Sequence, residues 1–152
     1  MIKHLGSNLA LALALASPPA GIFVQPRTYA GYTMAEVMRG ISWAETGHDP
    51  RAVGKLGEVS QYQILDICRR DFNRVNRTNI TMAQIAKSPT TAYRVGSWRF
   101  DRAWENFHRL HPRTQLACAL SAYNRGERKT RKRIGWDYRD KVIGYIKTKE
   151  TK

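Results

Sequence analysis

The stretch ISWAETGHDPRAVGKLGEVSQYQI, residues 41–64, joins the end of one predicted helix to a loop and then to a second helix. The first helix is predicted to begin after Thr33, because Glu36 follows at the capping-box spacing. Glu45 lies near its end, at the edge of an apolar face. The residues of that face recur at helical period: Met34, Val37, Met38, Ile41 and Ala44.

Glu45 is the first candidate for chemistry. A carboxyl group held against apolar neighbours has its charged form disfavoured, which suits a general acid working near neutral pH. From position alone, the alternative is an ordinary solvated Glu at a helix end. Pro50, Gly54 and Gly57 then predict a loop.

Three short blocks in the chain share their order and approximate spacing with a known family. The pattern E-S-x-F-x-P-x-A-x-S followed by G-A-x-G-L-M-Q is matched by residues 45–63, A-Y-N-x-G by residues 122–126, and Tyr-x-x-x-Val by Tyr138 and Val142. Over about residues 33–146 the chain therefore resembles the SLT-type lytic transglycosylases, which cleave peptidoglycan. Within the first block, Thr46 stands for the Ser and His48 for the aromatic residue. Ser60 replaces a Gly, which tolerates dihedrals that Ser rarely adopts.

The resemblance implies a mainly α fold of the lysozyme-like superfamily, a goose-lysozyme-like single helical domain with a substrate cleft. A short irregular or β segment is expected around residues 52–63, with the cleft between it and the helices that carry Tyr123 and Tyr138. The resemblance further implies that Glu45 acts twice, as acid and then as base, with no metal or cofactor. The residues expected to bind substrate are Thr46, Gln63, Tyr123, Asn124 and Tyr138.

The implied reaction cleaves the β-1,4 bond between N-acetylmuramic acid and N-acetylglucosamine and leaves a 1,6-anhydro end. One alternative is a hydrolytic muramidase on the same fold, with Asp49 or Glu58 holding the attacking water. Another is a non-catalytic basic protein that binds the cell wall through its charge. The expected partner is the peptidoglycan glycan strand. A small exported member would suit an envelope-spanning secretion, conjugation or pilus system, or phage lysis.

The 152 residues suggest one domain, 29–147, followed by a polar tail, 148–152. Residues 1–16 resemble a secretory signal peptide: a basic residue, a short alternating Leu-Ala core and an A-x-A cleavage site. An uncleaved N-terminal helix or membrane anchor is the alternative. Residues 17–28 read as a linker. These features predict a periplasmic or secreted protein without a stable membrane span once the signal is removed.

Further helices are predicted over 61–75, 113–124 and about 137–147. Thr81 with Gln84, and Ser88 before Pro89, predict two more helix starts. The 61–75 helix is expected to bury Tyr62, Ile64, Ile67, Cys68 and Phe72. Trp98 and Trp104 are expected to pack in the core, with sugar stacking as the alternative.

Cys68 and Cys118 are the only cysteines, which allows either one disulfide or two buried thiols. The chain carries 26 Lys and Arg against 12 Asp and Glu, a net charge of +14. Six of these cations lie in RGERKTRKR, residues 125–133, which reads as a basic loop. Behind a signal peptide, this loop favours attraction to the anionic cell envelope over nucleic-acid binding.

Overall fold

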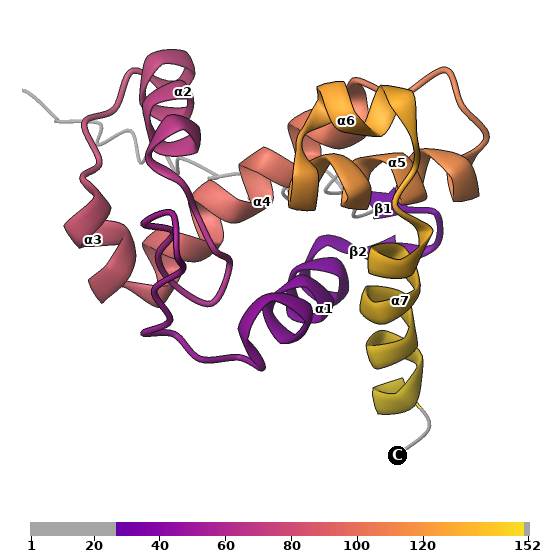
Figure 1. The fold of residues 1–152 in the computed structure, drawn as a ribbon, viewed down its shortest axis with the longest axis horizontal. Helices are drawn as coiled ribbons and strands as arrows, with labels where there is room; N and C mark the ends of the chain where they lie inside the picture. The colour runs from indigo at the N-terminus through magenta and orange to yellow at the C-terminus, as the bar shows by residue number, and fades with distance from the viewer. Residues whose placement is uncertain (1–26, 151–152) are drawn as a thin grey trace, which may run out of the picture.

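Helices dominate the computed structural model, which describes residues 27–150 (Figure 1). The predicted signal peptide, most of the predicted linker and residues 151–152 lie outside the described residues. The mainly α fold class is confirmed. The elements in chain order are β1 (Thr28–Tyr29), β2 (Tyr32–Thr33), α1 (Met34–Thr46), α2 (Asp66–Asn76), α3 (Met82–Lys87), α4 (Pro89–Glu105), α5 (Pro112–Arg125), α6 (Glu127–Lys132) and α7 (Trp136–Glu150).

Helix α4 crosses the middle of the molecule (Figure 1). Helices α2 and α3 lie towards one end of α4, whereas α5 and α6 lie towards the other. Helices α1 and α7 pack against each other, and the long loop after α1 returns beneath α2. No helix within residues 27–150 has the length and apolar character needed to cross a bilayer.

The predicted helix starts are confirmed by side-chain hydrogen bonds. Thr33 and Glu36 form a reciprocal capping box at the start of α1, and Thr81 and Gln84 form a second one at α3. The Ser88 hydroxyl accepts from the backbone N–H of Thr91, with Pro at the first helical position of α4. Each cap satisfies backbone N–H groups that a helix N-terminus otherwise leaves without partners.

A two-stranded hairpin precedes α1 and was not predicted. Strands β1 and β2 pair antiparallel through a turn at Ala30 and Gly31, both with positive φ. Such a turn matches the natural twist of paired strands. Tyr29 is buried here against the edges of two aromatic rings, and its hydroxyl donates to Asp101 at 2.9 Å. The hairpin thereby fixes the entry of the chain into α1.

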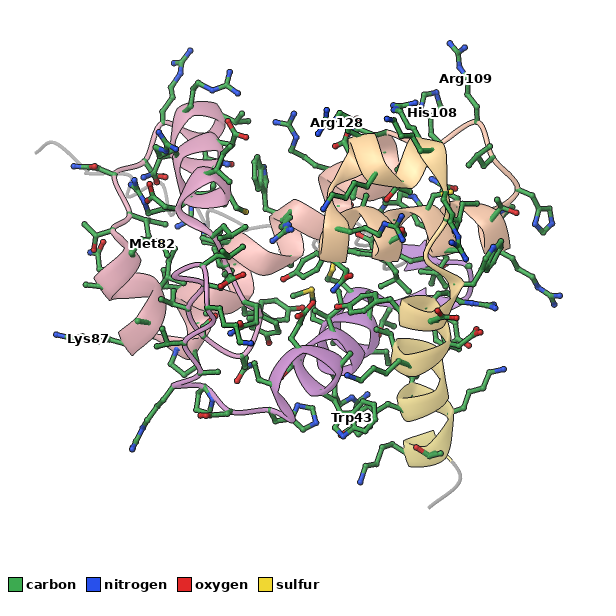
Figure 2. All side chains as sticks on the ribbon, viewed as in Figure 1. Trp43, Met82, Lys87, His108, Arg109 and Arg128 are labelled. Carbon is green, nitrogen blue, oxygen red and sulfur yellow. The ribbon has the colours of Figure 1, made fainter. Side chains whose placement is uncertain are left out.

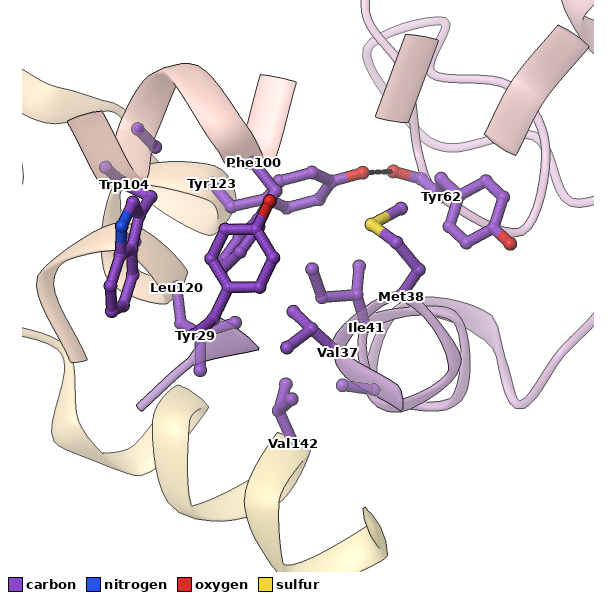
Figure 3. Close-up of a cluster of buried hydrophobic side chains, with 14 of the residues drawn as sticks. Tyr29, Val37, Met38, Ile41, Tyr62, Phe100, Trp104, Leu120, Tyr123 and Val142 are labelled. Atoms are coloured by element: carbon purple, nitrogen blue, oxygen red, sulfur yellow. Dashed lines mark hydrogen bonds between the residues drawn. The ribbon is translucent and has the colours of Figure 1, made fainter. Parts of the chain in front are cut away.

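The core is built around α5, which is buried along nine consecutive residues, 115–123. Side chains from α1, α4 and α7 converge on it (Figure 3). Trp104 is buried with its ring against Tyr29, and half-buried Trp98 packs edge-on against Phe72. Packing is therefore the role of both tryptophans in this structure.

Helices α1 and α7 approach closely at Gly40. A Cβ atom at this position would lie 2.8 Å from Val142 Cγ1 and 3.0 Å from the Val142 carbonyl oxygen. Since real Cβ atoms essentially never come this close to a neighbour, only glycine allows this separation of the two helices. The close packing brings the C-terminal turn of α1 against the side of α7.

Two predicted segments differ from the structure. The helix expected over 61–75 begins only at Asp66, and Ile67 is 60% exposed instead of buried. Before it, Val59 pairs with both Val53 and Ile64, which confirms a small β segment near residues 52–63. The stretch 125–133, expected to be a loop, contains the short helix α6, of which Thr130 is the buried residue.

The last helix, α7, runs three residues beyond its predicted end. Four residues of this helix are predicted to point inward: Val142, Ile143 and Ile146 are buried, and Tyr138 is half-buried. Cys68 and Cys118 are both buried free thiols, which corresponds to the second of the two arrangements considered for them. Burial raises the pKa of both thiols, so they remain protonated and unreactive at neutral pH.

Candidate active site

The C-terminal turn of α1 presents Glu45 half-buried at the surface. Gly47 ends the helix in the left-handed conformation, with φ 65°, and its N–H returns to the Trp43 carbonyl at 2.9 Å. Lys141 of α7 donates to the Ala44 carbonyl at 2.5 Å. A cation at this end of a helix satisfies a free carbonyl and offsets the negative end of the helix dipole.

Tyr138 of α7 reaches the catalytic candidate directly. Its hydroxyl donates to Glu45 Oε1 at 2.6 Å, across 93 residues of sequence. No other hydrogen bond to the Glu45 carboxyl is formed within residues 27–150. Oε1 is therefore the Glu45 oxygen that the protein holds, and Oε2 accepts no hydrogen bond from these residues.

Three residues of α7 line up along α1 at spacings i, i+3 and i+7: Tyr138, Lys141 and Tyr145. The Tyr145 ring stacks on Trp43, with centroids 5.0 Å apart. Its hydroxyl lies 2.6 Å from His48 Nε2, while His48 Nδ1 lies 2.9 Å from the buried Ser42 hydroxyl. These contacts form a seam between the end of α1 and α7, made of Trp43, His48, Tyr138, Lys141 and Tyr145. The seam attaches residues before and after Glu45 to α7.

Sequence reasoning missed the Lys141, Tyr145 and His48 contacts in this seam. Tyr138 was singled out by its motif, and the residues one and two turns further along the same helix face would have been the next to test. In the sequence, His48 stands at the position where the family pattern has an aromatic residue. Its ring keeps an edge-to-face contact with Tyr145 and adds two hydrogen bonds.

Tyr123 is buried beside this region, and its hydroxyl is already bonded. It donates to the Tyr62 backbone carbonyl at 2.9 Å, as Figure 3 shows. The Arg99 guanidinium lies 4.5 Å from the Tyr123 ring centroid and donates to the Tyr123 carbonyl. Gly96 makes room for this arrangement, because a Cβ there would lie 3.3 Å from the Tyr123 hydroxyl. Tyr123 thus ties the loop before α2 to α5, while the next residue, Asn124, is exposed.

Thr46 and Gln63 lie where the loop folds back towards α1. The Thr46 hydroxyl is within 3.5 Å of three backbone carbonyls, including that of Gln61 at 3.4 Å. Gln63 has a positive φ of 46°, and its side-chain amide donates to the Ser60 carbonyl at 3.1 Å. Ser60 itself has φ 68°, the left-handed conformation that the family's glycine adopts easily. The Ser60 hydroxyl accepts from the Tyr62 backbone N–H, which supports this strained turn.

The other two acids near Glu45 in sequence have local partners. Asp49 is exposed, and its carboxylate accepts from the Arg51 backbone N–H at 2.8 Å. Glu58 accepts from the Leu56 backbone N–H at 2.9 Å and lies over Gly54, where a Cβ would collide with it. Both carboxylates accept hydrogen bonds from backbone N–H groups of their own loop. The Glu45 carboxyl instead accepts one from Tyr138, on a helix that is distant in sequence.

The buried tyrosines make stability sensitive to alkaline pH. Burial raises the pKa of Tyr123, and burial together with the Glu45 carboxylate raises that of Tyr138, well above the ordinary value near 10. Unfolding frees both phenols to ionise, so their contribution to stability is complete below about pH 10 and is lost as pH rises towards the folded-state pKa. We expect the melting temperature to fall above about pH 10, and less steeply in Tyr123→Phe. Phenolate absorbance from all seven tyrosines before unfolding would contradict this.

Comparison with protein families gives a match over most of the chain. The transglycosylase SLT domain model matches residues 24–145, which is most of the chain and includes all three sequence blocks. Comparisons with curated proteins and with solved structures gave no significant match. The matched range contains Glu45, its partner Tyr138 and the whole seam between α1 and α7.

Proposed function

Because the chain belongs to the transglycosylase SLT family, whose lysozyme-like members are lytic transglycosylases acting on peptidoglycan, we propose that Glu45 is its single catalytic acid–base. The observation that carries this assignment is the 2.6 Å hydrogen bond from Tyr138 to Glu45 Oε1. A buried phenol with a raised pKa stays protonated, so it acts as a permanent donor. The bond fixes the rotation of the carboxyl group and directs Oε2 towards the substrate.

The proposed reaction uses this one carboxyl group twice. Protonated Glu45 gives its proton to the oxygen that leaves with N-acetylglucosamine as the bond from muramyl C1 to that oxygen breaks. The muramyl C6 hydroxyl then bonds to C1, and its proton returns to the Glu45 carboxylate. The products are a free hydroxyl end and a 1,6-anhydro ring. Atoms and charge balance without water, and Glu45 is restored to its protonated state.

The remaining site residues are proposed to shape and position the sugar site. Asn124 is exposed beside Tyr123 and offers an amide to the substrate's acetamido or hydroxyl groups. Gln63 is held by the loop close to Tyr62, whose carbonyl binds Tyr123. Thr46 acts through the backbone, since its hydroxyl faces three carbonyls. Holding the strand in one orientation is worth large factors in rate.

We further propose that the protein acts outside the cytoplasm, where its substrate lies. A single catalytic domain and a strong positive charge suit local opening of the wall by an envelope-spanning secretion, conjugation or pilus system, or during phage lysis. The charge is proposed to draw the enzyme onto the polyanionic wall. The support for this setting is the substrate class and the net charge of +14.

Product mass tests the proposed reaction. We expect purified sacculi treated with the protein to release muropeptides that end in anhydro-muramic acid, each one water lighter than the hydrolysis product. Mass spectrometry distinguishes the two directly. Muropeptides with reducing ends would indicate a hydrolytic muramidase, and Asp49 and Glu58 would then be the residues to test. No release, with sacculus binding retained, would indicate a wall-binding protein without catalysis.

Helix α6 tests the role of charge. Arg128, Lys129, Arg131 and Lys132 are exposed and have no acidic partner within the described residues. Changing all four to Gln should weaken sacculus binding at low salt and flatten its salt dependence, because the Debye length falls from about 10 Å at 0.1 M to about 3 Å at 1 M. Turnover of a short soluble glycan should change little, since proton transfer at Glu45 is local.

A charge-matched control removes four cations outside α6. Arg39, Arg77, Lys87 and Arg113 are exposed, form no ion pair within the described residues and can be changed to Gln together. Co-sedimentation with sacculi across a salt series should show a larger loss for the α6 variant than for this control. Equal losses would mean that total charge, and not α6, governs binding.

A further inference from the structure

His48 lies three residues after Glu45, where the chain leaves α1. Its backbone φ is 74°, a left-handed conformation that residues other than glycine rarely adopt. Its ring has a partner at each nitrogen: Nδ1 lies 2.9 Å from the Ser42 hydroxyl, and Nε2 lies 2.6 Å from the Tyr145 hydroxyl. A strained backbone of this kind persists where the surrounding contacts over-determine it. His48 has one such contact on α1 and one on α7.

The Ser42 hydroxyl depends on this ring. Ser42 is 2% exposed, and within residues 27–150 its side chain hydrogen-bonds to His48 Nδ1 and to no other group. A buried hydroxyl that loses its partner destabilises the fold, because it has already given up its bonds to water. The ring therefore has a fixed place against α1, and from that place it reaches Tyr145 on α7.

Tyr145 connects His48 to the helix that carries Tyr138. It follows Tyr138 by seven residues, two turns along the same face of α7. Its ring is stacked on Trp43, which lies between the end of α1 and α7 in Figure 2, and it also makes an edge-to-face contact with the His48 ring. Residues on both sides of Glu45 in the chain, Trp43 before it and His48 after it, therefore contact one side chain of α7.

Apolar packing sets the distance between α1 and α7 but not their register. Aliphatic side chains of α7 pack against Gly40 of α1, and such contacts are non-directional. Hydrogen bonds require defined distances and angles, so the bond between His48 and Tyr145 adds what packing lacks, a fixed position of α7 along α1. The Tyr138 hydroxyl reaches Glu45 Oε1 from the same helix at 2.6 Å. A small shift of α7 would lengthen that bond.

We propose that His48 is a positioning residue for Glu45. By bonding both Ser42 and Tyr145, it fixes α7 along α1 and thereby holds the Tyr138 hydroxyl on Glu45 Oε1. This inference rests on the proposed function, in which Glu45 is the catalytic acid–base. The family pattern has Phe at this position, and a Phe ring can contact Tyr145 but forms neither hydrogen bond. In this chain the orientation of Glu45 therefore depends on a polar contact that the family pattern does not contain.

His48→Phe tests the two hydrogen bonds, because it keeps an aromatic ring beside Tyr145. On a short soluble glycan, kcat for the anhydro product should fall about threefold to tenfold, as loss of one neutral hydrogen bond does, and KM should change less than about twofold. The fall is limited because Lys141 still bonds the Ala44 carbonyl. His48→Gln can offer an amide near the Nε2 position and should recover part of kcat. A rise in KM with kcat unchanged would make His48 a substrate contact and would overturn the inference.

A double-mutant comparison distinguishes positioning from a general effect on stability. If His48 acts through the Tyr138 hydroxyl, replacing it matters little once that hydroxyl is gone. We therefore expect His48→Phe to lower kcat by less than about twofold in a Tyr138→Phe background. An equal fall in both backgrounds would show that His48 acts independently of Tyr138, contrary to the inference.

Two further variants complete the comparison. Tyr145→Phe keeps the stack on Trp43 and the bond between His48 and Ser42, so it should fold normally and lower kcat in the same direction as His48→Phe. The matched control is His108→Phe. His108 is also an exposed histidine bonded through Nδ1, to the Glu105 carbonyl at 2.8 Å, and it lies well away from Trp43 in Figure 2. This control should leave kcat unchanged in both backgrounds.

The NMR signal of the Tyr138 hydroxyl proton separates this inference from the proposed function. A short hydrogen bond to a carboxylate moves such a proton downfield and slows its exchange with water, and Tyr138→Phe identifies the resonance by removing it. We expect the resonance to broaden in His48→Phe and in Tyr145→Phe and to stay sharp in His108→Phe. If the wild type makes no anhydro product, the proposed function fails, and the resonance still decides whether His48 holds Tyr138 on Glu45. Absence of the resonance from the wild type, or no change of it in His48→Phe, refutes the inference even in an active enzyme.

Discussion

Replacing Glu45 with Gln is expected to lower the rate of anhydro-muropeptide release by about 10²–10⁴-fold, the loss typical for removal of a general acid–base. The upper end applies, because one carboxyl group serves both proton transfers. Gln keeps the size of the side chain and a carbonyl oxygen that can still accept from Tyr138. The fold and sacculus binding should therefore be retained, which circular dichroism and co-sedimentation can verify.

Asp49→Asn is the control for this substitution. Asp49 is an exposed acid four residues away, bonded only to its own loop, so its loss should leave anhydro product formation nearly unchanged. Near wild-type release by Glu45→Gln would refute the assignment of Glu45. A large loss in Asp49→Asn would instead point to a second catalytic carboxylate and to hydrolysis.

Tyr138→Phe is expected to have the second largest effect, a fall in kcat of about 10- to 100-fold with a small change in KM. A hydrogen bond to a charged group contributes about 1.5–3 kcal/mol, and this one orients the reacting carboxyl. Removing the hydroxyl leaves the ring in place but frees Glu45 to rotate. The matched control is Tyr32→Phe, whose hydroxyl makes no hydrogen bond within residues 27–150.

The split between kcat and KM distinguishes orientation of Glu45 from a contact with the sugar. A rise in KM with kcat unchanged would show that Tyr138 binds substrate in ground and transition state alike. Thermal unfolding of Tyr138→Phe should show only a modest loss of stability. A rate loss explained entirely by unfolded protein would contradict the orienting role.

Local features of the fold could be predicted from sequence because they depend on residues a few positions apart. The capping boxes at Thr33 and Thr81 and the Ser88-Pro89 start each use a hydroxyl and a partner within one turn of helix. Helix α5 ends at Arg125, one residue beyond its predicted end, with Gly126 as the C-cap. In each case the side chain that decides the boundary is also adjacent to it.

The errors arose where backbone conformation is set by distant contacts. Ser60 and Gln63 adopt positive φ, and α2 begins only at Asp66. At Ser60 the family's Gly was the one signal of this conformation, and at Gln63 the residue type gives none. The predicted helix extended the helical period back to Tyr62, which lies in the loop, and this placed Ile67 on the buried face by mistake. The strands of the hairpin, two residues each, are too short to show an alternating pattern.

The candidate site also has a part that depends on neighbouring residues and a part that depends on distant contacts. Glu45 could be placed near a helix end from sequence, but its hydrogen bond to Tyr138 spans 93 residues and was not predicted. The family resemblance implied only that Tyr138 binds substrate. The structure adds that the Tyr123 hydroxyl donates a hydrogen bond to the Tyr62 carbonyl, whereas Asn124 is exposed. The order of the motifs predicted the candidate site, and long-range packing determines which contacts each of its side chains makes.

The place of α7 in the chain controls when activity arises during biosynthesis. Glu45 leaves the ribosome 93 residues before Tyr138, and the face of α1 at Gly40 remains uncovered until Val142 and Ile146 follow. A nascent chain that ends at α6 lacks both the orienting phenol and the helix that packs against α1. With Glu45 as the proposed acid–base, we therefore expect partly synthesised chains to have little activity towards peptidoglycan until α7 has docked.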